Sequence, residues 1–171
     1  MKLAKENLVV VRNVLFLCTG NSARSILAEA LLNDLGRGAF RAYSAGSQPA
    51  GAVNPFAIEL LQQRGLFSDS MRSKSWDEFT GPDAPGIDFV FTVCDAAAES
   101  CPVWPGRPQT AHWGMSDPAS VVGTDEEKRL AFVAAYQLLA KKIERFIHLP
   151  FDSMSRTLLQ TQLDEIGREY I

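Results

Sequence analysis

The sequence predicts an α/β fold in which a small parallel β-sheet has helices on both of its faces. Short apolar runs at residues 14–17 and 87–93 are typical of buried strands. Longer segments with apolar residues at helical spacing follow such runs along the chain. Strands that alternate with helices in this way form parallel sheets, because each helix crosses back over the sheet to start the next strand.

In the first half of the chain, strand, loop and helix follow one another closely. Residues 1–12 hold only a short apolar run, too short for a secretory or membrane segment, and are interpreted as a tail leading into the first strand. The strand at residues 14–17 enters a loop, which opens an amphipathic helical segment at residues 26–32. Residues 40–46 predict a second strand. Asn54-Pro55 then starts a helix that ends near Gly65.

The second half is predicted to contain two more strands and two long helices. Residues 68–86 are polar and broken by glycine and proline, which predicts a short helix and a loop, and residues 102–110 are predicted to be irregular. The strand at residues 87–93 is followed, within residues 111–119, by a short edge strand and a loop. A long helix is predicted at residues 125–147 and a final helix at about 153–169. The predicted apolar side of the long helix is Leu130, Phe132, Val133, Tyr136, Leu139, Ile143 and Phe146, and that of the final helix is Leu158, Leu159, Leu163 and Ile166.

Length and composition indicate one compact domain. The chain has 171 residues, of which 46% are hydrophobic and 22% charged, and it contains no repeat or linker, so residues 1–171 are predicted to be a single domain. Its net charge of −3 gives no indication of a nucleic-acid surface. Two histidines are too few for a metal cluster, and the cysteines lack zinc-type spacing. We therefore predict no metal, no cofactor, and neither nucleic acid nor membrane as a partner.

The loop at residues 18–25 carries the predicted chemistry. Its sequence is Cys-Thr-Gly-Asn-Ser-Ala-Arg-Ser. A loop entering a helix N-terminus presents backbone N–H groups and the positive end of the helix dipole, which together bind an oxyanion. Cys18 would be a thiolate nucleophile at this position, and Arg24 would hold two oxygens of a tetrahedral anion. The residues predicted to bind the substrate are Thr19, Gly20, Asn21, Ser22, Ala23, Arg24 and Ser25.

A plainer interpretation of this loop exists. Cys18 would then be an inert buried residue and Arg24 a solvated residue of the first helical turn. The strand before the loop and the helix after it favour the catalytic interpretation. Gly20 permits backbone geometry that other residues resist. Ser25 would either donate a hydrogen bond to Cys18 or cap the helix.

Cys94 and Cys101 are the other two cysteines. Cys94 follows the strand pattern at residues 87–93, and sites in parallel sheets gather at the carboxyl ends of strands, so Cys18 and Cys94 could share one crevice. The alternative is that Cys94 and Cys101 are small buried hydrophobic residues. An odd number of cysteines argues against a purely structural disulfide framework. Free thiols are the default in a reducing compartment, so we predict a cytoplasmic protein.

These features resemble the thioredoxin-coupled arsenate reductases built on the low-molecular-weight protein tyrosine phosphatase fold. The residues that carry the resemblance are the loop at 18–25, the pair Cys94 and Cys101, and His112-Trp113-Gly114 leading to Asp117-Pro118-Ala119. The resemblance covers about residues 13–147 and implies a four-stranded parallel sheet of flavodoxin-like order. Residues 153–171 lie outside it and are interpreted as a C-terminal helical extension.

The resemblance also implies a mechanism. Cys18 attacks the arsenic of arsenate, and Asp117 supplies a proton to the departing oxygen, although Asp-Pro is also a common turn starter. Cys94 then attacks Cys18 and arsenite is released. Cys101 next attacks Cys94, which leaves a Cys94–Cys101 disulfide. A disulfide needs Cα atoms within about 7 Å, whereas seven extended residues span roughly 23 Å, so the segment between them must curl.

The same resemblance implies the partners. The substrate would be arsenate, with phosphate or sulfate able to occupy the loop, and the reductant thioredoxin, with a glutaredoxin or a small thiol as alternatives. Some such reductases bind potassium through Asn, Glu, Ser and Asp side chains, of which Asn21, Glu29 and Ser44 match three. Residues 72–77 contain basic residues and no clean equivalent of the acid. A lysine there could replace the cation, so no ion is predicted.

Two other functions compete with this one. A low-molecular-weight protein tyrosine phosphatase needs only Cys18, Arg24 and Asp117, but an aromatic residue usually follows Asp-Pro in those enzymes, and here Ala119 follows. A non-catalytic oxyanion-binding or redox-sensing protein would leave an intact nucleophile, arginine and acid unexplained. Arsenate reductase alone accounts for Cys94 and Cys101. His112 is predicted to orient the loop that carries Asp117, or to pack against Trp113.

Overall fold

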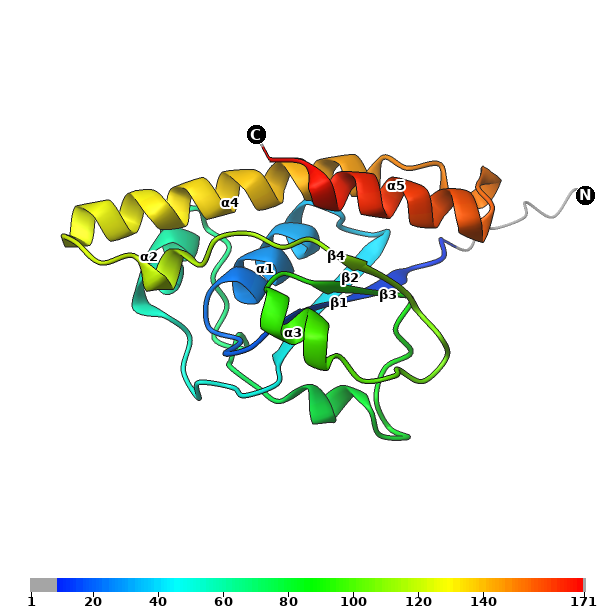
Figure 1. The fold of residues 1–171 in the computed structure, drawn as a ribbon, viewed down its shortest axis with the longest axis horizontal. Helices are drawn as coiled ribbons and strands as arrows, with labels where there is room; N and C mark the ends of the chain where they lie inside the picture. The colour runs from blue at the N-terminus through cyan, green and yellow to red at the C-terminus, as the bar shows by residue number, and fades with distance from the viewer. Residues whose placement is uncertain (1–8, 171) are drawn as a thin grey trace, which may run out of the picture.

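The computed structural model describes residues 9–170, and at its centre lies a four-stranded, all-parallel sheet with strand order β2-β1-β3-β4 (Figure 1). This confirms the predicted sheet. The strands are β1 (Arg12–Cys18), β2 (Phe40–Gly46), β3 (Phe89–Thr92) and β4 (Gln109–His112). The α-helices are α1 (Arg24–Leu35), α2 (Pro55–Gln63), α3 (Asp95–Ser100), α4 (Asp125–Ile147) and α5 (Arg156–Arg168). Shorter 3₁₀ helices are η1 (Trp76–Phe79), η2 (Pro118–Ser120) and η3 (Phe151–Ser153).

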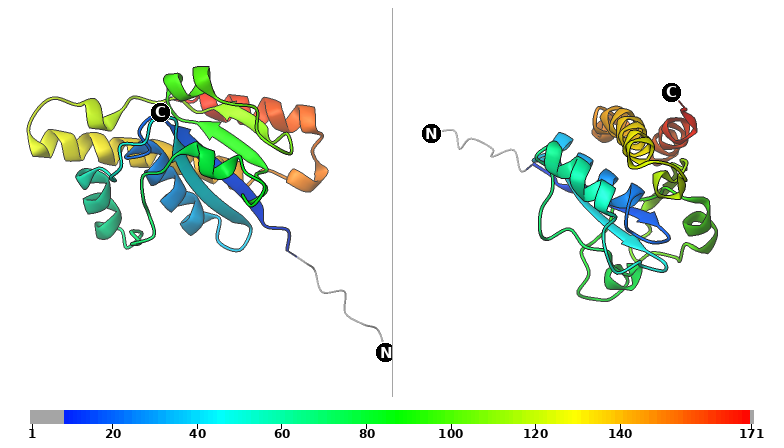
Figure 2. Two further views of the ribbon diagram at one scale, coloured as in Figure 1. Left: turned by 90° about the horizontal axis from the view of Figure 1, so that it is seen from below. Right: turned by 90° about the vertical axis from the view of Figure 1, so that its left-hand side faces the viewer.

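Helices lie on both sides of the sheet, as the sequence predicts. α4 and α5 run along one side, whereas η1 and α3 lie on the other (Figures 1 and 2). The amphipathic helix predicted at residues 26–32 is α1, and it is buried on most of its surface rather than on one side. The reason is that α1 is packed between the sheet and α4.

The core forms around β1, whose residues 14–17 are fully buried. β1 is a central strand with helices on both sides, which explains its continuous apolar run. Next to it, the ring of Phe91 stacks on Trp113 with centroids 4.0 Å apart. The indole N–H of Trp113 donates to the carbonyl oxygen of Leu163 at 3.1 Å, so α5 is attached to this aromatic cluster.

Several predicted details are wrong. Leu130 is 63% exposed and Leu158 is 49% exposed, so neither belongs to the apolar side of its helix. Helical spacing identifies an apolar stripe but does not show how far a neighbour covers it. β4 begins at Gln109, inside the segment predicted to be irregular, and ends at His112 opposite Thr92. α5 begins at Arg156, where the side chain of Ser155 caps it, because η3 occupies the predicted start.

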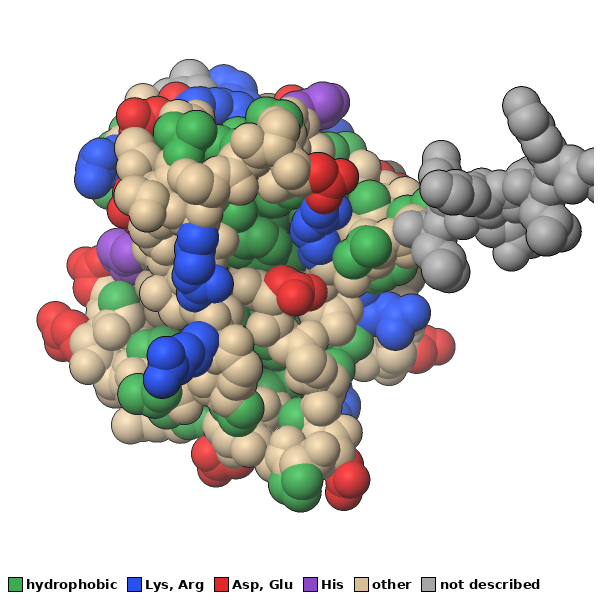
Figure 3. Space-filling model, turned by 90° about the vertical axis from the view of Figure 1, so that its right-hand side faces the viewer, with side chains coloured by type: hydrophobic (Ala, Val, Ile, Leu, Met, Phe, Trp, Pro, Cys, Tyr) green, Lys and Arg blue, Asp and Glu red, His purple; other side chains and the backbone are tan. Residues whose placement is uncertain are grey.

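The ends and the surface of the chain can be compared with the sequence within residues 9–170. Residues 1–8 of the predicted tail, and Ile171 at the end of the predicted C-terminal extension, lie outside the described residues. Within residues 9–170, no helix is both long enough and apolar enough to cross a membrane. On the face shown in Figure 3, acidic and basic side chains are interspersed. The side chains of Arg12 and Asp152 form an ion pair at 2.9 Å.

Lys142 of α4 joins the last two helices. Its buried ammonium group donates to the carbonyl oxygens of Ile166 and Gly167, each at 2.8 Å, near the end of α5. α5 in turn packs directly on the end of β4. A Cβ atom at Gly167 would lie 2.4 Å from the carbonyl oxygen of His112. This contact matters for the site, because the chain continues from β4 to Asp117.

The charge of Lys142 predicts a pH dependence of stability. Burial, with a smaller contribution from Arg145, lowers the pKa of Lys142 to about 8. The unfolded chain therefore binds more protons than the folded protein from about pH 8 to pH 10.5, and stability rises with pH in this window. We expect the unfolding free energy of the wild type, relative to Lys142→Met, to rise by up to about 3 kcal/mol between these limits. Urea unfolding of the wild type and of Lys142→Met at pH 8 and pH 10.5 measures this rise. A difference in unfolding free energy that is the same at both pH values would contradict the lowered pKa of Lys142.

Candidate active site

Cys18 is the last residue of β1, and its thiol is buried at the base of the loop formed by residues 19–23. The sulfur lies 2.8 Å from the hydroxyl oxygen of Ser25 and accepts a hydrogen bond from the backbone N–H of Asn21 at 3.2 Å. The side-chain amide of Asn21 donates to the same hydroxyl at 2.8 Å. The structure shows the predicted contact between Ser25 and Cys18. Ser25 does not cap the helix, because the N-cap of α1 is Ala23.

The loop is oriented by bonds to the segment that follows β2. Three loop carbonyls accept backbone hydrogen bonds from it: Thr19 from Gln48, Gly20 from Ala50 and Ser22 from Asn54. In a peptide group the C=O points away from the N–H of the following residue. These three bonds therefore turn the N–H groups of Gly20, Asn21 and Ala23 toward the inside of the loop. The N–H of Asn21 beside the Cys18 sulfur is one of them. The loop is therefore a cradle of N–H donors suited to an anion.

Two residues make this tight loop possible. Asn21 has a φ of 45°, in the left-handed region that asparagine tolerates better than most residues. Gly46, at the end of β2, lies directly against the loop. A Cβ atom there would lie 2.4 Å from the carbonyl oxygen of Thr19. Any other residue at position 46 would push the loop out of shape.

Arg24 is the first residue of α1 and lies over the same cradle. One terminal nitrogen donates to the carbonyl oxygen of Met115 at 2.9 Å, which fixes the guanidinium group against the chain leading to Asp117. Its Nε is buried and has no hydrogen-bond partner among residues 9–170. A buried guanidinium N–H without a partner is costly unless a ligand satisfies it. The orphaned Nε therefore indicates an anion-binding position.

Asp117 faces Arg24 across the mouth of the loop. One carboxylate oxygen, Oδ2, lies 3.5 Å from Nη2 of Arg24. The other, Oδ1, accepts a hydrogen bond from the backbone N–H of Ala119 at 3.0 Å and caps η2. The structure thus shows Asp117 in the turn-capping role, with its other carboxylate oxygen beside Arg24.

Cys94 lies just after β3, at the same edge of the sheet as Cys18. Its buried sulfur is 3.4 Å from the hydroxyl oxygen of Thr19. Backbone pairing between Val93 and Leu17 holds the ends of β3 and β1 together. The structure therefore places Cys94 beside the loop that follows Cys18, at the carboxyl ends of neighbouring strands.

Cys101 lies at the other end of α3 from Cys94. α3, six residues long and so about 9 Å from end to end, separates it from Cys94. Its sulfur is half-buried and accepts a hydrogen bond from the indole N–H of Trp104 at 3.1 Å. Burial raises the pKa of the Cys101 thiol, and the Trp104 hydrogen bond offsets part of this effect. All three cysteines are free thiols in this structure.

The sequence does not reveal the roles of Trp104 and His112. Trp104 lies in the segment predicted to be irregular, but it is buried and its indole N–H donates to the Cys101 sulfur. The ring of His112 lies against Gly114, in the segment that leads to Asp117. It lies between Thr92 and Asp95, with a distance of 2.8 Å on each side. Its two hydrogen-bonding partners belong to β3 and α3, which are other elements of the chain.

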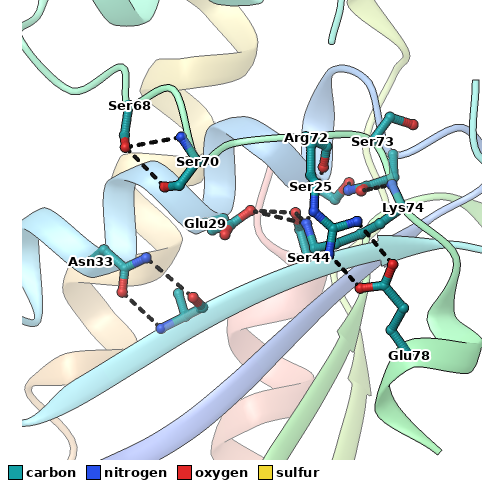
Figure 4. Close-up of polar contacts among 12 residues, drawn as sticks. Ser25, Glu29, Asn33, Ser44, Ser68, Ser70, Arg72, Ser73, Lys74 and Glu78 are labelled. Atoms are coloured by element: carbon teal, nitrogen blue, oxygen red, sulfur yellow. Dashed lines mark hydrogen bonds and ion pairs between the residues drawn. The ribbon is translucent and has the colours of Figure 1, made fainter. Parts of the chain in front are cut away.

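Lys74 occupies the position considered for a potassium ion (Figure 4). Its ammonium nitrogen lies 3.9 Å from the carboxylate of Glu29, 3.5 Å from the hydroxyl of Ser44 and 3.1 Å from the carbonyl oxygen of Arg72. The hydroxyl of Ser44 also donates to Glu29. Because the ammonium group already supplies the positive charge, these residues do not fit a potassium ion.

The Lys74 cluster also supports the loop. The backbone N–H of Lys74 donates to the side-chain oxygen of Asn21 at 3.0 Å, and Asn21 contacts both Ser25 and the Cys18 sulfur. Lys74 is therefore connected to the nucleophile through one residue, Asn21, whose side chain accepts from Lys74 and whose backbone N–H donates to the Cys18 sulfur. Burial raises the pKa of Glu29 and lowers that of Lys74, and their mutual attraction opposes both shifts.

We expect Lys74→Met to lower the unfolding free energy by about 3 kcal/mol at pH 7, because it leaves the Glu29 carboxylate buried without its cation. The loss shrinks as the pH falls, since the raised pKa of Glu29 lets the carboxyl take up a proton. The double variant Lys74→Met/Glu29→Gln should regain most of the stability. Denaturant unfolding at pH 7 and pH 5 measures these effects. A double variant as unstable as the single one would contradict the pairing.

Comparison with known proteins agrees with this geometry. The sequence profile described as low molecular weight phosphotyrosine protein phosphatase matches residues 13–160. The chain therefore belongs to that family. It is 37% identical over 133 residues to the arsenate reductase of Halalkalibacterium halodurans, which covers 78% of this chain and 93% of that protein.

Solved structures give the same result. The arsenate reductase of Archaeoglobus fulgidus is similar with a TM-score of 0.58 and 30% identity, over 77% of this chain and 98% of that one. The thioredoxin-dependent arsenate reductase of Corynebacterium glutamicum is similar with a TM-score of 0.53 and 25% identity, over 80% of this chain and 64% of that one.

Proposed function

We propose that the protein is an arsenate reductase that uses Cys18, Cys94 and Cys101 in sequence. The observation that carries the proposal is the Cys94 sulfur, 3.4 Å from Thr19 of the anion-binding loop. Hydrolysis of a phosphate ester needs the loop, Arg24 and Asp117 but has no use for a second thiol at this place. Reduction of arsenate needs two electrons, which two thiols supply when they form a disulfide.

In the first step arsenate lies in the cradle of loop N–H groups, with two oxygens on the guanidinium group of Arg24. The Cys18 sulfur forms a bond to arsenic while one As–O bond breaks. Hydroxide is a poor leaving group, so Asp117 donates a proton to the departing oxygen, which leaves as water. The hydroxyl of Ser25, 2.8 Å from the sulfur, stabilises the Cys18 thiolate before attack.

In the second step the Cys94 thiolate attacks the Cys18 sulfur. The electron pair of the S–As bond stays on arsenic, which goes from the +5 to the +3 state and leaves as arsenite. The two sulfur atoms are oxidised to a disulfide. The Cys101 thiolate then attacks Cys94, which frees Cys18 as a thiolate and leaves a Cys94–Cys101 disulfide.

The cycle closes when an external dithiol returns two electrons and two protons to Cys94 and Cys101. We propose a protein of the thioredoxin type for this role, supported by the thioredoxin-dependent relative from Corynebacterium glutamicum. We also propose a cytoplasmic location, because the cycle starts from three reduced thiols and the cytoplasm keeps thiols reduced.

The function is tested by supplying arsenate and NADPH with either a thioredoxin or a glutaredoxin recycling system. NADPH consumption that matches arsenite formation with thioredoxin is the expected result. Hydrolysis of p-nitrophenyl phosphate without any arsenite would instead assign the protein to the phosphatases of its family.

Asp117→Asn tests the general acid. Asparagine keeps the cap on Ala119 but has no proton to give, so we expect kcat for arsenate reduction to fall by about 10²- to 10⁴-fold. The stability of the protein should change little, because Asp117 and Asn are both good caps. A decrease of less than about threefold would mean that another group, or water, protonates the leaving oxygen.

A further inference from the structure

α3 is held in place by few side chains. Among its six residues only Ala97 is buried. An open cavity of about 360 Å³ lies beside it, with Ala98, Cys101 and His112 in its lining. Short elements with few buried apolar contacts open at a low free-energy cost. If Cys101 is to reach Cys94, as the proposed function requires, α3 is the element that must open.

His112 connects α3 to the sheet. Thr92 and His112 are opposite each other in β3 and β4, and the Thr92 hydroxyl lies 2.8 Å from Nδ1 of the ring. On the other side, Nε2 lies 2.8 Å from Oδ1 of Asp95, the first residue of α3. Both ring nitrogens thus have partners, one on the sheet and one on the helix.

The direction of the ring depends on Gly114. A Cβ atom at this position would lie 2.4 Å from Nε2 and 3.0 Å from Cε1 of His112. Only glycine leaves room for the imidazole to reach Asp95. The adjacent Trp113 points the other way and stacks on Phe91 in the core. The sequence His-Trp-Gly therefore places one ring in the core and the other against α3.

We propose that His112 is a positioning residue of the thiol relay, whose bond to Asp95 latches α3 in its reduced conformation. The latch opens when Cys101 moves toward Cys94, and it closes again when the disulfide is reduced. The role in the relay rests on the proposed function, whereas the hold on α3 does not. Cys101, half-buried beside Trp104, is the group that the latch keeps away from Cys94.

The exposure of the pair fits a contact that breaks in every turnover. The side chain of Asp95 is 89% exposed and that of His112 is 41% exposed. Ion pairs and hydrogen bonds in such surroundings contribute little to stability. Removing this one should therefore change the population of open α3 by only a few-fold and leave the rest of the fold intact.

The test is the rate at which iodoacetamide alkylates Cys101 in the reduced protein, without arsenate, with the sites assigned by peptide mass. We expect Asp95→Ala and His112→Ala each to raise the rate at Cys101 by about two- to fivefold. Cys18, alkylated in the same sample, should keep its rate. Glu99→Ala is the matched control, because it removes an exposed carboxylate from the same helix and should change nothing.

The double variant Asp95→Ala/His112→Ala shows whether Asp95 and His112 act through one shared contact or independently of each other. The effects of removing two partners of one contact are not additive. Cys101 should therefore be alkylated no faster in the double variant than in the single variants. The latch would be contradicted if the increases in the Cys101 alkylation rate multiplied in the double variant, or if the variants had the same rate as the wild type. If circular dichroism shows that His112→Ala does not fold, Asp95→Ala against Glu99→Ala decides the question.

A single turnover with arsenate distinguishes a failure of the latch from a failure of the proposed function. The Cys94–Cys101 disulfide should form faster in Asp95→Ala by the same factor as alkylation. Faster alkylation in the variant, together with a wild type that does not reduce arsenate, would reject the reductase and keep the hold on α3. Arsenate reduction by the wild type with unchanged alkylation in both variants would reject the latch alone.

Discussion

Replacement of Cys18 by serine is expected to abolish arsenate reduction, with a loss of at least about 10⁴-fold. The serine hydroxyl is far less nucleophilic than a thiolate, and it has no sulfur from which Cys94 could form a disulfide. The anion cradle does not depend on the thiol, because Arg24 and the loop N–H groups remain. Arsenite formation under coupled turnover measures the effect.

Binding of sulfate or phosphate by calorimetry is the control for the Cys18→Ser protein. We expect an affinity within a few-fold of the wild type, because the buried Nε of Arg24 still needs an acceptor. Arsenite formation above about one hundredth of the wild-type rate would contradict the assignment of Cys18 as nucleophile.

Replacement of Cys94 by serine is expected to stop arsenite release while the anion site stays intact. Without the second thiol, no group beside the loop supplies the electrons that reduce arsenic. The wild type should slowly hydrolyse p-nitrophenyl phosphate, a reaction that uses Cys18, Arg24 and Asp117 but not Cys94. Comparison of arsenite and p-nitrophenol formation by the variant therefore separates the two chemistries.

Cys101→Ser is the matched variant for Cys94→Ser. It leaves the first two steps intact, so one equivalent of arsenite should still be released and a Cys18–Cys94 disulfide should accumulate. If Cys94→Ser also released one equivalent of arsenite, Cys101 would have to attack Cys18 directly, and the proposed order of the thiols would be wrong.

Most of the sheet and the central loop can be predicted from local patterns. β2 at Phe40–Gly46 and α4 at Asp125–Ile147 have the predicted bounds, because their ends carry local signals such as the glycine that closes β2. The position of Cys94 beside the loop that follows Cys18 is explained by a general property of parallel sheets, in which the carboxyl ends of strands meet at one edge.

Long-range contacts explain what could not be predicted. Whether Leu130 is covered depends on how far the neighbouring elements extend along α4. The direction of the His112 ring depends on the space above Gly114 and on Asp95, which belongs to another element. Lys74 lies 45 positions after Glu29 in the chain, and only the fold brings its ammonium group to the carboxylate. Such contacts carry no periodicity that a sequence displays.

The central claim is that three thiols act in sequence, and a single turnover tests it most directly. Fully reduced protein is mixed with arsenate in the absence of any reductant, free thiols and arsenite are counted, and the disulfide is located by peptide mass. We predict the loss of two thiols per chain, one arsenite released, and a linkage between Cys94 and Cys101. Retention of all three free thiols after exposure to arsenate would contradict the account.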